Sequence, residues 1–155
     1  MANLRVMTSL NSELAETNAL YVNPRDATTP FVKMGRFIYK CIPHPDVDVG
    51  TVRMNAIARR AIYPSESVVL EEFTVPLTYG TKTVTVRAEY VKPKPGTPIN
   101  LVNAIRTMID GNIVSIGQKL TITHEGVAIL IEVTDMDAPG VITMNTEVSM
   151  MWVPS

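Results

Sequence analysis

The short run IPHPDVDVG gathers the side chains with the clearest potential for metal chemistry. His44, Asp46 and Asp48 alternate within it, and an imidazole with two carboxylates can bind a divalent cation. Pro43 and Pro45 stiffen the same run, and the sequence places no further ligand group beside it. We therefore interpret the run as a loop with solvated polar residues and expect no metal site.

Two other combinations could support catalysis. Cys41 and His44 could form a thiol–imidazole nucleophile, but a single cysteine inside an apolar strand is more often a small core residue. Asp135 and Asp137 could act as an acid and a base, but they adjoin the run APG, which is typical of a turn at a strand end. Neither a Gly-x-x-x-x-Gly-Lys-Ser/Thr phosphate loop nor a Cys-x-x-Cys pair occurs. We expect no catalytic residue and no cofactor in this chain.

Basic residues are the remaining candidates for function. Arg59 and Arg60 precede a turn at Tyr63, and Lys92 and Lys94 lie in a proline-rich connection. Prolines restrict the conformations of that connection, so its lysines are presented at a low entropic cost. Such basic patches serve acidic protein partners as readily as nucleic acid. The alternative is that all four are ordinary solvated charges.

Composition narrows the class of protein. The chain has 155 residues, 46% of them apolar, and a formal charge of -1, which excludes intrinsic disorder. The longest apolar stretches, such as 127–131, are far shorter than a membrane span. We expect no secretory signal, and the single cysteine suits a reducing compartment.

Charge is distributed unevenly along the chain. The stretch up to Arg106 has 13 basic and 9 acidic residues, whereas the stretch from Thr107 has 1 basic and 6 acidic residues. A total near zero argues against a general nucleic-acid binder, because neutralising phosphates needs concentrated positive charge. A local basic patch is compatible with these counts.

The elements that must position these residues fall into two groups. Short apolar runs separated by proline and glycine predict strands in the first half, with no helical stripe, and suggest a small barrel or sandwich. We expect these strands at 19–22, 37–42, 51–57 and 67–75. The segment Pro76–Gly80 is a plausible boundary between the groups.

The second half predicts an α+β unit. Its helix should have Thr97 as N-cap and Pro98 at the first helical position, and should end at Gly111. Leu101, Val102, Ile105, Met108 and Ile109 would form its apolar face. Strands are expected at 81–90 and 143–153, with a hairpin of 119–123 and 127–133 around His124-Glu125-Gly126.

Several short motifs together carry a family resemblance. NALYVNPRD contains an Asn-x-x-x-Val-Asn opening, and IPHPDVDVG contains His-Pro-x-Val-x-x-Gly. IVSIGQKLTI contains a Ser-x-Gly-Gln turn, and VAILIEVTDMD ends in Met-Asp. In this order and with similar spacing, they resemble the N-terminal domain of the N-ethylmaleimide-sensitive fusion protein family, which are vesicle-fusion AAA+ ATPases. The similarity runs from about Ser12 to Val153.

The resemblance implies a fold and a role. The fold would be a double-psi β-barrel over 1–78 followed by a small α/β roll over 79–155. The chain would be a non-catalytic front end of a hexameric ATPase, whose ATP- and magnesium-binding modules would follow Ser155. Family members bind the acidic C-terminal region of SNAP adaptors on SNARE complexes, which ATP hydrolysis then disassembles. The isolated domain would be a cytoplasmic monomer that reaches membranes only through SNAP–SNARE complexes and binds no nucleic acid.

The family's binding residues lie in a basic groove between the two subdomains. By position, Arg59 and Arg60 match its basic pair, Lys92 and Lys94 match its paired lysines, and Arg5 matches an N-terminal arginine. Here Pro93 separates the two lysines, and a second Ser-x-Gly-Gln expected near Ser65 is absent.

Two alternatives remain, the first in the same architectural class and the second in a different class of protein. One is the N-domain of a p97/Cdc48-like ATPase, which binds ubiquitin-pathway adaptors. The other is a small barrel enzyme that uses a carboxylate such as Asp46 or Asp48. The Ser-x-Gly-Gln turn favours the vesicle-fusion family over the first alternative, and the sequence lacks the Gly-Ser self-processing site of aspartate-decarboxylase-like barrels.

Overall fold

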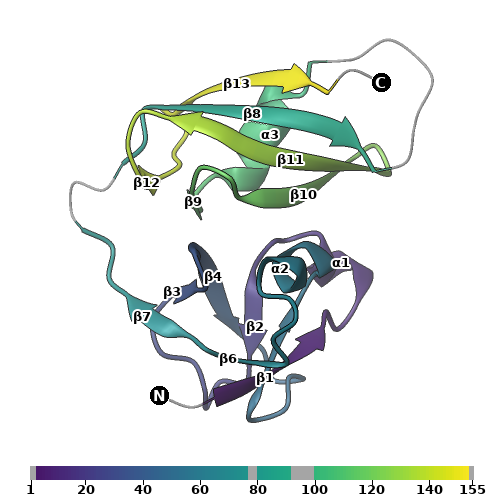
Figure 1. Ribbon diagram of the computed structural model, residues 1–155, viewed down its shortest axis with the longest axis vertical. Coiled ribbons are helices and arrows are strands. Elements are labelled where there is room, and N and C mark those ends of the chain that lie inside the picture. The colour runs from purple at the N-terminus through teal and green to yellow at the C-terminus, as the bar shows by residue number, and fades with distance from the viewer. Residues whose placement is uncertain (1–2, 77–79, 92–99, 154–155) are drawn as a thin grey trace. The chain divides into compact units, whose positions relative to one another are not determined.

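A computed structural model describes residues 3–76, 80–91 and 100–153 of the chain. The chain divides into two compact units, Met1–Leu77 and Thr78–Ser155, at a point inside the predicted Pro76–Gly80 boundary. Both units are dominated by strands with few helices, so the structure is mixed α/β, as expected. Figure 1 shows each unit with most of its elements labelled.

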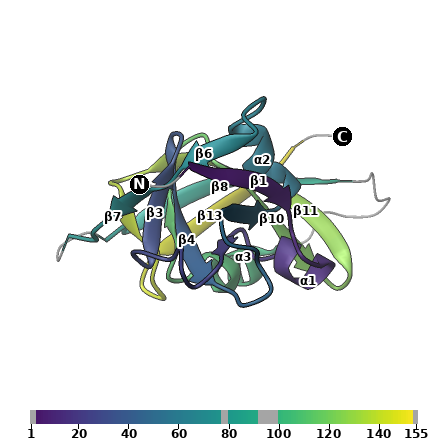
Figure 2. The ribbon, with the colours of Figure 1, turned by 90° about the horizontal axis from the view of Figure 1, so that it is seen from below.

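Unit 1 is a nearly closed, barrel-like sheet of seven strands in the order β6-β1-β5-β2-β4-β3-β7. Its edge strands β6 and β7 are separated in sequence by Leu70 alone, so the chain itself links the two edges. Figure 2 shows β1 and β6 side by side, as their antiparallel pairing requires. The elements are β1 Asn3–Thr8, α1 Ser12–Ala15, β2 Leu20–Val22, β3 Phe31–Met34, β4 Phe37–Pro43, β5 Thr51–Met54, α2 Ala56–Ala61, β6 Ser67–Val69 and β7 Glu71–Phe73.

Two parallel pairs distinguish this sheet from a simple meander. β1 pairs with β5 and β2 pairs with β4 in parallel, whereas β2 and β5 are antiparallel. Parallel partners cannot be joined by a tight hairpin, so the chain must cross over between them. The alternate residues that point inward form one core, made of Leu4, Leu20, Val22, Val32, Met34, Phe37, Tyr39, Cys41, Val52, Met54 and Ala58.

The first half contains three elements that were not predicted, β1, α1 and β3, and two predicted strands differ from the structure. The predicted strand 51–57 ends at Met54, because Asn55 starts helix α2 by accepting a hydrogen bond from the Ala58 amide at 2.9 Å. The predicted strand 67–75 divides at Leu70, since β6 pairs with β1 while β7 pairs with β3. The prediction that this half lacks helices was therefore wrong.

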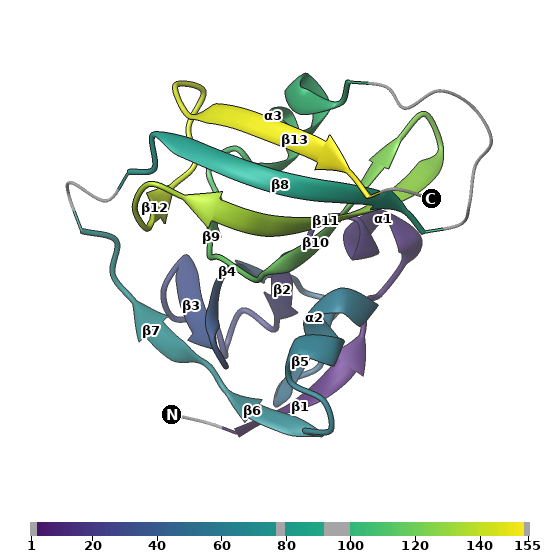
Figure 3. The same cartoon turned by 45° about the horizontal axis from the view of Figure 1, so that its top comes forward.

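Unit 2 is a four-stranded sheet, β10-β11-β8-β13, whose order can be followed in Figure 3. Helix α3 packs on one face of the sheet through Leu101, Ile105 and Ile109, which belong to the unit's apolar core. A small second sheet pairs β9 with β12. The elements are β8 Thr83–Tyr90, α3 Val102–Ile109, β9 Ile113–Val114, β10 Lys119–His124, β11 Val127–Met136, β12 Gly140–Val141 and β13 Glu147–Trp152.

The predicted hairpin and the apolar face of the predicted helix are confirmed. Glu125 and Gly126 have φ of 51° and 77°, the left-handed pair that a tight hairpin turn requires. The start of the helix was predicted wrongly, because α3 begins at Val102. The side chain of Asn100 accepts a hydrogen bond from the Val102 amide at 2.9 Å. Thr97 and Pro98 lie outside the described residues. None of the described helices is long or apolar enough to cross a bilayer.

Candidate partner-binding surface

The candidate metal loop is held together by its own hydrogen bonds. The Asp46 amide donates to Nδ1 of His44 at 3.1 Å, and the His44 ring packs edge-on against Tyr21. Val47 is buried, and its carbonyl accepts a hydrogen bond from the Asn23 side chain at 2.8 Å. Within the described part of the chain, no group of three or more potential ligand side chains could hold a metal ion. The run is a structural turn.

Cys41 lies in the core of unit 1, as predicted. Burial raises the pKa of its thiol to about 11, so the thiol stays protonated at neutral pH. A protonated, buried thiol is a poor nucleophile. The arrangement therefore favours a packing role over the thiol–imidazole alternative.

Asp135 lies near the end of β11 and Asp137 directly follows the strand, and both contribute to the sheet. Oδ1 of Asp137 accepts hydrogen bonds from the amides of Thr83 and Lys82 at 2.9 and 3.0 Å, where β8 begins. These backbone hydrogen bonds, led by that of Thr83, lower the pKa of Asp137. Asp135 follows an irregularity in the β11–β8 register and accepts its neighbour's amide. Asp137 therefore fixes the strand end, as the turn interpretation predicted, whereas Asp135 is still paired within β11.

Arg59 and Arg60 occupy the last turn of α2, which carries no acidic residue. Arg60 is exposed, whereas Arg59 is half-buried and its Nε has no hydrogen-bond partner among the residues that the structure describes. Neither guanidinium forms an ion pair with any described residue, and the nearest carboxylate in the sequence belongs to Glu66. Within the described part of the chain, these two adjacent cations thus have no countercharge.

The position at a helix end also offers these arginines a structural role that needs no partner. Cations near a helix C-terminus interact favourably with the helix dipole, typically by 0.3–1 kcal/mol at exposed sites. Arg60 could serve that role without any partner. A test of partner binding must therefore measure stability alongside affinity.

Of the other candidates, only Arg5 lies among the described residues. Arg5 is exposed on β1, opposite Thr51 of β5 and Ser67 of β6, and its guanidinium approaches Sδ of Met7 at 3.5 Å. No described side-chain hydrogen bond or ion pair joins it to α2. Lys92 and Lys94 lie outside the described residues.

The uneven charge along the chain does not follow the structural division. Met1–Leu77 carries 8 basic and 8 acidic residues, and Thr78–Ser155 carries 6 and 7. The change of sign after Arg106 falls inside helix α3. Any basic surface is therefore local, and the arginine pair on α2 is the clearest described example.

The motifs behind the family resemblance are turn-forming residues. Asn18 has φ of 59° and accepts a hydrogen bond from the Asn55 side chain at 3.2 Å. Gly50 has φ of 84° and donates to Asp26 at 2.8 Å, and Gly117 has φ of 89°. Gln118 is 2% exposed and accepts the Ser115 amide. Each motif thus has a structural reason for its residue types.

Two surface features were missed from sequence. Tyr63, just after α2, is 83% exposed. On the sheet of unit 2, a recess of about 250 Å³ is lined by charged and apolar residues, and two of the charged residues form the Arg87–Glu132 ion pair. Alternation along β8, β10 and β11 could have indicated this face, but nothing in the sequence indicates the exposure of Tyr63. The recess is lined by Arg87, Glu89, Lys119, Leu130, Glu132 and Val153.

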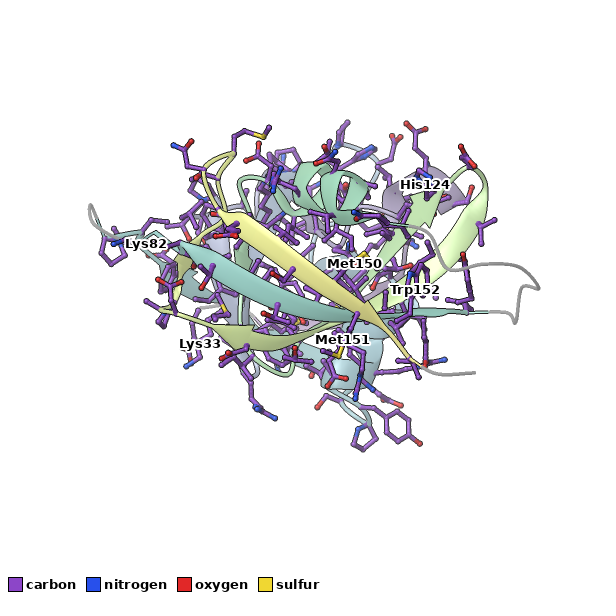
Figure 4. All side chains as sticks on the ribbon, turned by 90° about the horizontal axis from the view of Figure 1, so that it is seen from above. Lys33, Lys82, His124, Met150, Met151 and Trp152 are labelled. Carbon is purple, nitrogen blue, oxygen red and sulfur yellow. The ribbon has the colours of Figure 1, made fainter. Side chains whose placement is uncertain are left out.

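The edge strand β13 alternates between the core and solvent. Figure 4 shows Met150 and Met151 on opposite sides of the strand. Met150 packs on the core, Trp152 stacks on Tyr90, and Met151 is 56% exposed.

No protein-family model matches this sequence, and no curated protein matches it either.

Proposed function

We propose that this chain is the adaptor-binding N-domain of a vesicle-fusion AAA+ ATPase and that it binds SNAP proteins on SNARE complexes. The observation that carries the proposal is the pair Arg59–Arg60 at the end of α2, two adjacent cations without a described countercharge. An acidic partner would supply that countercharge and would be steered toward the surface.

The described architecture supports the same proposal. A nearly closed sheet with two parallel pairs suits a double-psi β-barrel, and a four-stranded sheet with one helix suits the following roll. The motif residues that carry the resemblance form turns at the places where the chain must reverse. We further propose a non-catalytic role in this chain, without a cofactor of its own, and contributions to binding from Arg5, Lys92 and Lys94.

Each contact of this kind is weak. An exposed ion pair contributes up to about 1 kcal/mol, so useful affinity requires several pairs. Repetition of the domain around a hexameric ATPase would multiply them. In the cell, this role would place the protein in the cytoplasm, at membranes that carry SNAP–SNARE complexes.

A direct binding measurement tests the proposal. Calorimetric titration of a SNAP adaptor into the chain should give binding that weakens as salt rises from 50 to 300 mM, because exposed charges are screened over roughly 10 Å at 0.1 M. The matched titration uses a ubiquitin-pathway adaptor. Absence of SNAP binding would contradict the proposal, and binding to the ubiquitin-pathway adaptor alone would favour a p97/Cdc48-like N-domain.

A further inference from the structure

The turn after α2 presents a large aromatic side chain beside the two arginines. Tyr63 is 83% exposed, which is more than any other large apolar side chain among the described residues. Its backbone is held in place: the Ile62 amide donates to the Arg59 carbonyl at 3.2 Å, the Tyr63 amide to the Arg60 carbonyl at 3.3 Å, and the Ser65 amide to the Ile62 carbonyl at 2.8 Å. The ring therefore projects from an ordered turn.

The core of unit 1 does not use this ring. Ala58 of α2 is buried in the core, and Ile62, directly after the helix, packs against the core. These neighbours supply the apolar contacts that anchor α2, so Tyr63 is free to face solvent. A tyrosine in this position leaves a large apolar area exposed to water, and burying that area against a partner would be favourable.

Resting on the proposed function, we propose that Tyr63 is the apolar anchor of the Arg59–Arg60 surface. The partner would then offer an apolar pocket for the phenol ring, bordered by carboxylates for the two guanidinium groups. Tyrosine and arginine are enriched among the hot spots of protein interfaces, and tyrosine supplies a large contact area at a low cost in entropy. The arginine pair alone recognises any acidic surface, whereas Tyr63 makes recognition specific for one with such a pocket.

Three single substitutions separate the contribution of the ring from that of charge. Tyr63→Ala removes the ring, Tyr63→Phe keeps the ring without its hydroxyl, and Arg60→Gln removes one charge. Val49→Ala is the matched control, because Val49 is 57% exposed in the same unit but outside α2 and its turn. Each variant is titrated with the SNAP adaptor by calorimetry at low and high salt, and its thermal unfolding is recorded.

Tyr63→Ala should weaken binding at least about tenfold, as expected for an interface hot spot. The salt dependence and the unfolding temperature should stay those of the original chain. Tyr63→Phe should bind within about threefold, because the ring supplies most of the area. Arg60→Gln should weaken binding and also flatten the salt dependence, and Val49→Ala should change neither quantity.

The outcomes distinguish a failure of the Tyr63 anchor from a failure of the proposed SNAP-binding function. Unchanged affinity for Tyr63→Ala together with weakened binding by Arg60→Gln would overturn the anchor while leaving the proposed function intact. A loss of affinity in Val49→Ala equal to that in Tyr63→Ala would also overturn it, because the effect would not be local. A complete lack of SNAP binding by the unsubstituted chain would overturn the proposed function and, with it, this anchor.

Discussion

The end of β11 and the end of α2 treat their charged side chains in opposite ways. At β11, Asp137 accepts two backbone hydrogen bonds from the start of β8. At α2, Arg60 is exposed without a described partner, and Tyr63 projects beside it. A charged group with internal partners holds the fold, whereas one without them is available to another molecule. Substitutions in the first region should therefore change stability, and those in the second should change binding.

The largest effect on stability is expected beside Asp137, at Gly140. A Cβ at this position would lie 2.4 Å from the carbonyl carbon of Gly80 and 2.6 Å from its Cα and N. Gly140→Ala must therefore separate two backbones, and we expect it to lower the free energy of unfolding by about 2–4 kcal/mol. Denaturant unfolding measures this.

Gly80→Ala is the matched control, because a Cβ there meets nothing within 4 Å. It should leave the free energy of unfolding within about 1 kcal/mol of the original value. Equal effects of the two substitutions would show that the close approach of the Gly140 and Gly80 backbones does not cause the loss of stability.

The next effect concerns the residue that starts α2. The buried Asn55 accepts the Ala58 amide and donates to the Ala15 carbonyl at 3.0 Å and to Asn18. Asn55→Ala should therefore lower the free energy of unfolding by about 1–3 kcal/mol, since it removes the acceptor of the buried Ala58 amide and two half-buried hydrogen bonds. Thermal unfolding measures the loss.

Asn55→Asp sharpens the test, because the aspartate keeps the capping oxygen but loses both donated hydrogen bonds. An intermediate stability is expected. If Asn55→Ala is as stable as the original chain, the network does not hold α2 in place.

Asp137 should make stability depend on pH in the acid range. Its folded-state pKa is lowered below the ordinary value of 3.8, mainly by the Thr83 amide. The stabilisation is therefore fully present above that value and is lost as pH falls through the lower, folded-state pKa. Unfolding measured between pH 7 and pH 2 should show that stability falls as the pH is lowered. Asp137→Asn should reduce this loss and should leave SNAP binding at neutral pH unchanged. An identical acid profile in that variant would contradict the assignment.

The smallest effect is a gain at the hairpin turn. Glu125 has φ of 51°, which asparagine adopts more readily than glutamate. Glu125→Asn creates the favoured Asn-Gly turn and should raise the free energy of unfolding by about 0.5 kcal/mol. The midpoint of denaturant unfolding would report it, and a decrease would contradict the turn assignment.

The elements that could be predicted from sequence are those specified by local pattern. The β10–β11 hairpin follows from alternation on either side of Glu125-Gly126, and the apolar face of α3 follows from its spacing. Helix α2 was missed because six residues are too few to show a helical period, although Asn55 was a visible cap. The division of β6 from β7 depends on their different strand partners, which no local pattern encodes.

The candidate surface was only partly predictable for the same reason. Arg59 and Arg60 were identified from sequence and from the family resemblance, but as loop residues before a turn. Their position at a helix end, and the absence of a described countercharge, depend on how distant segments pack. The exposure of Tyr63 depends on Ala58 and Ile62 filling the core in its place.

Reversing charge on the proposed surface tests the central claim most directly. The double variant Arg60→Glu, Lys94→Glu is titrated with the SNAP adaptor by calorimetry, and its thermal unfolding is recorded in the same buffer. We predict that binding weakens by more than about tenfold, because attraction to an acidic partner becomes repulsion, while the domain stays folded. Unchanged affinity in a folded double variant would contradict the account.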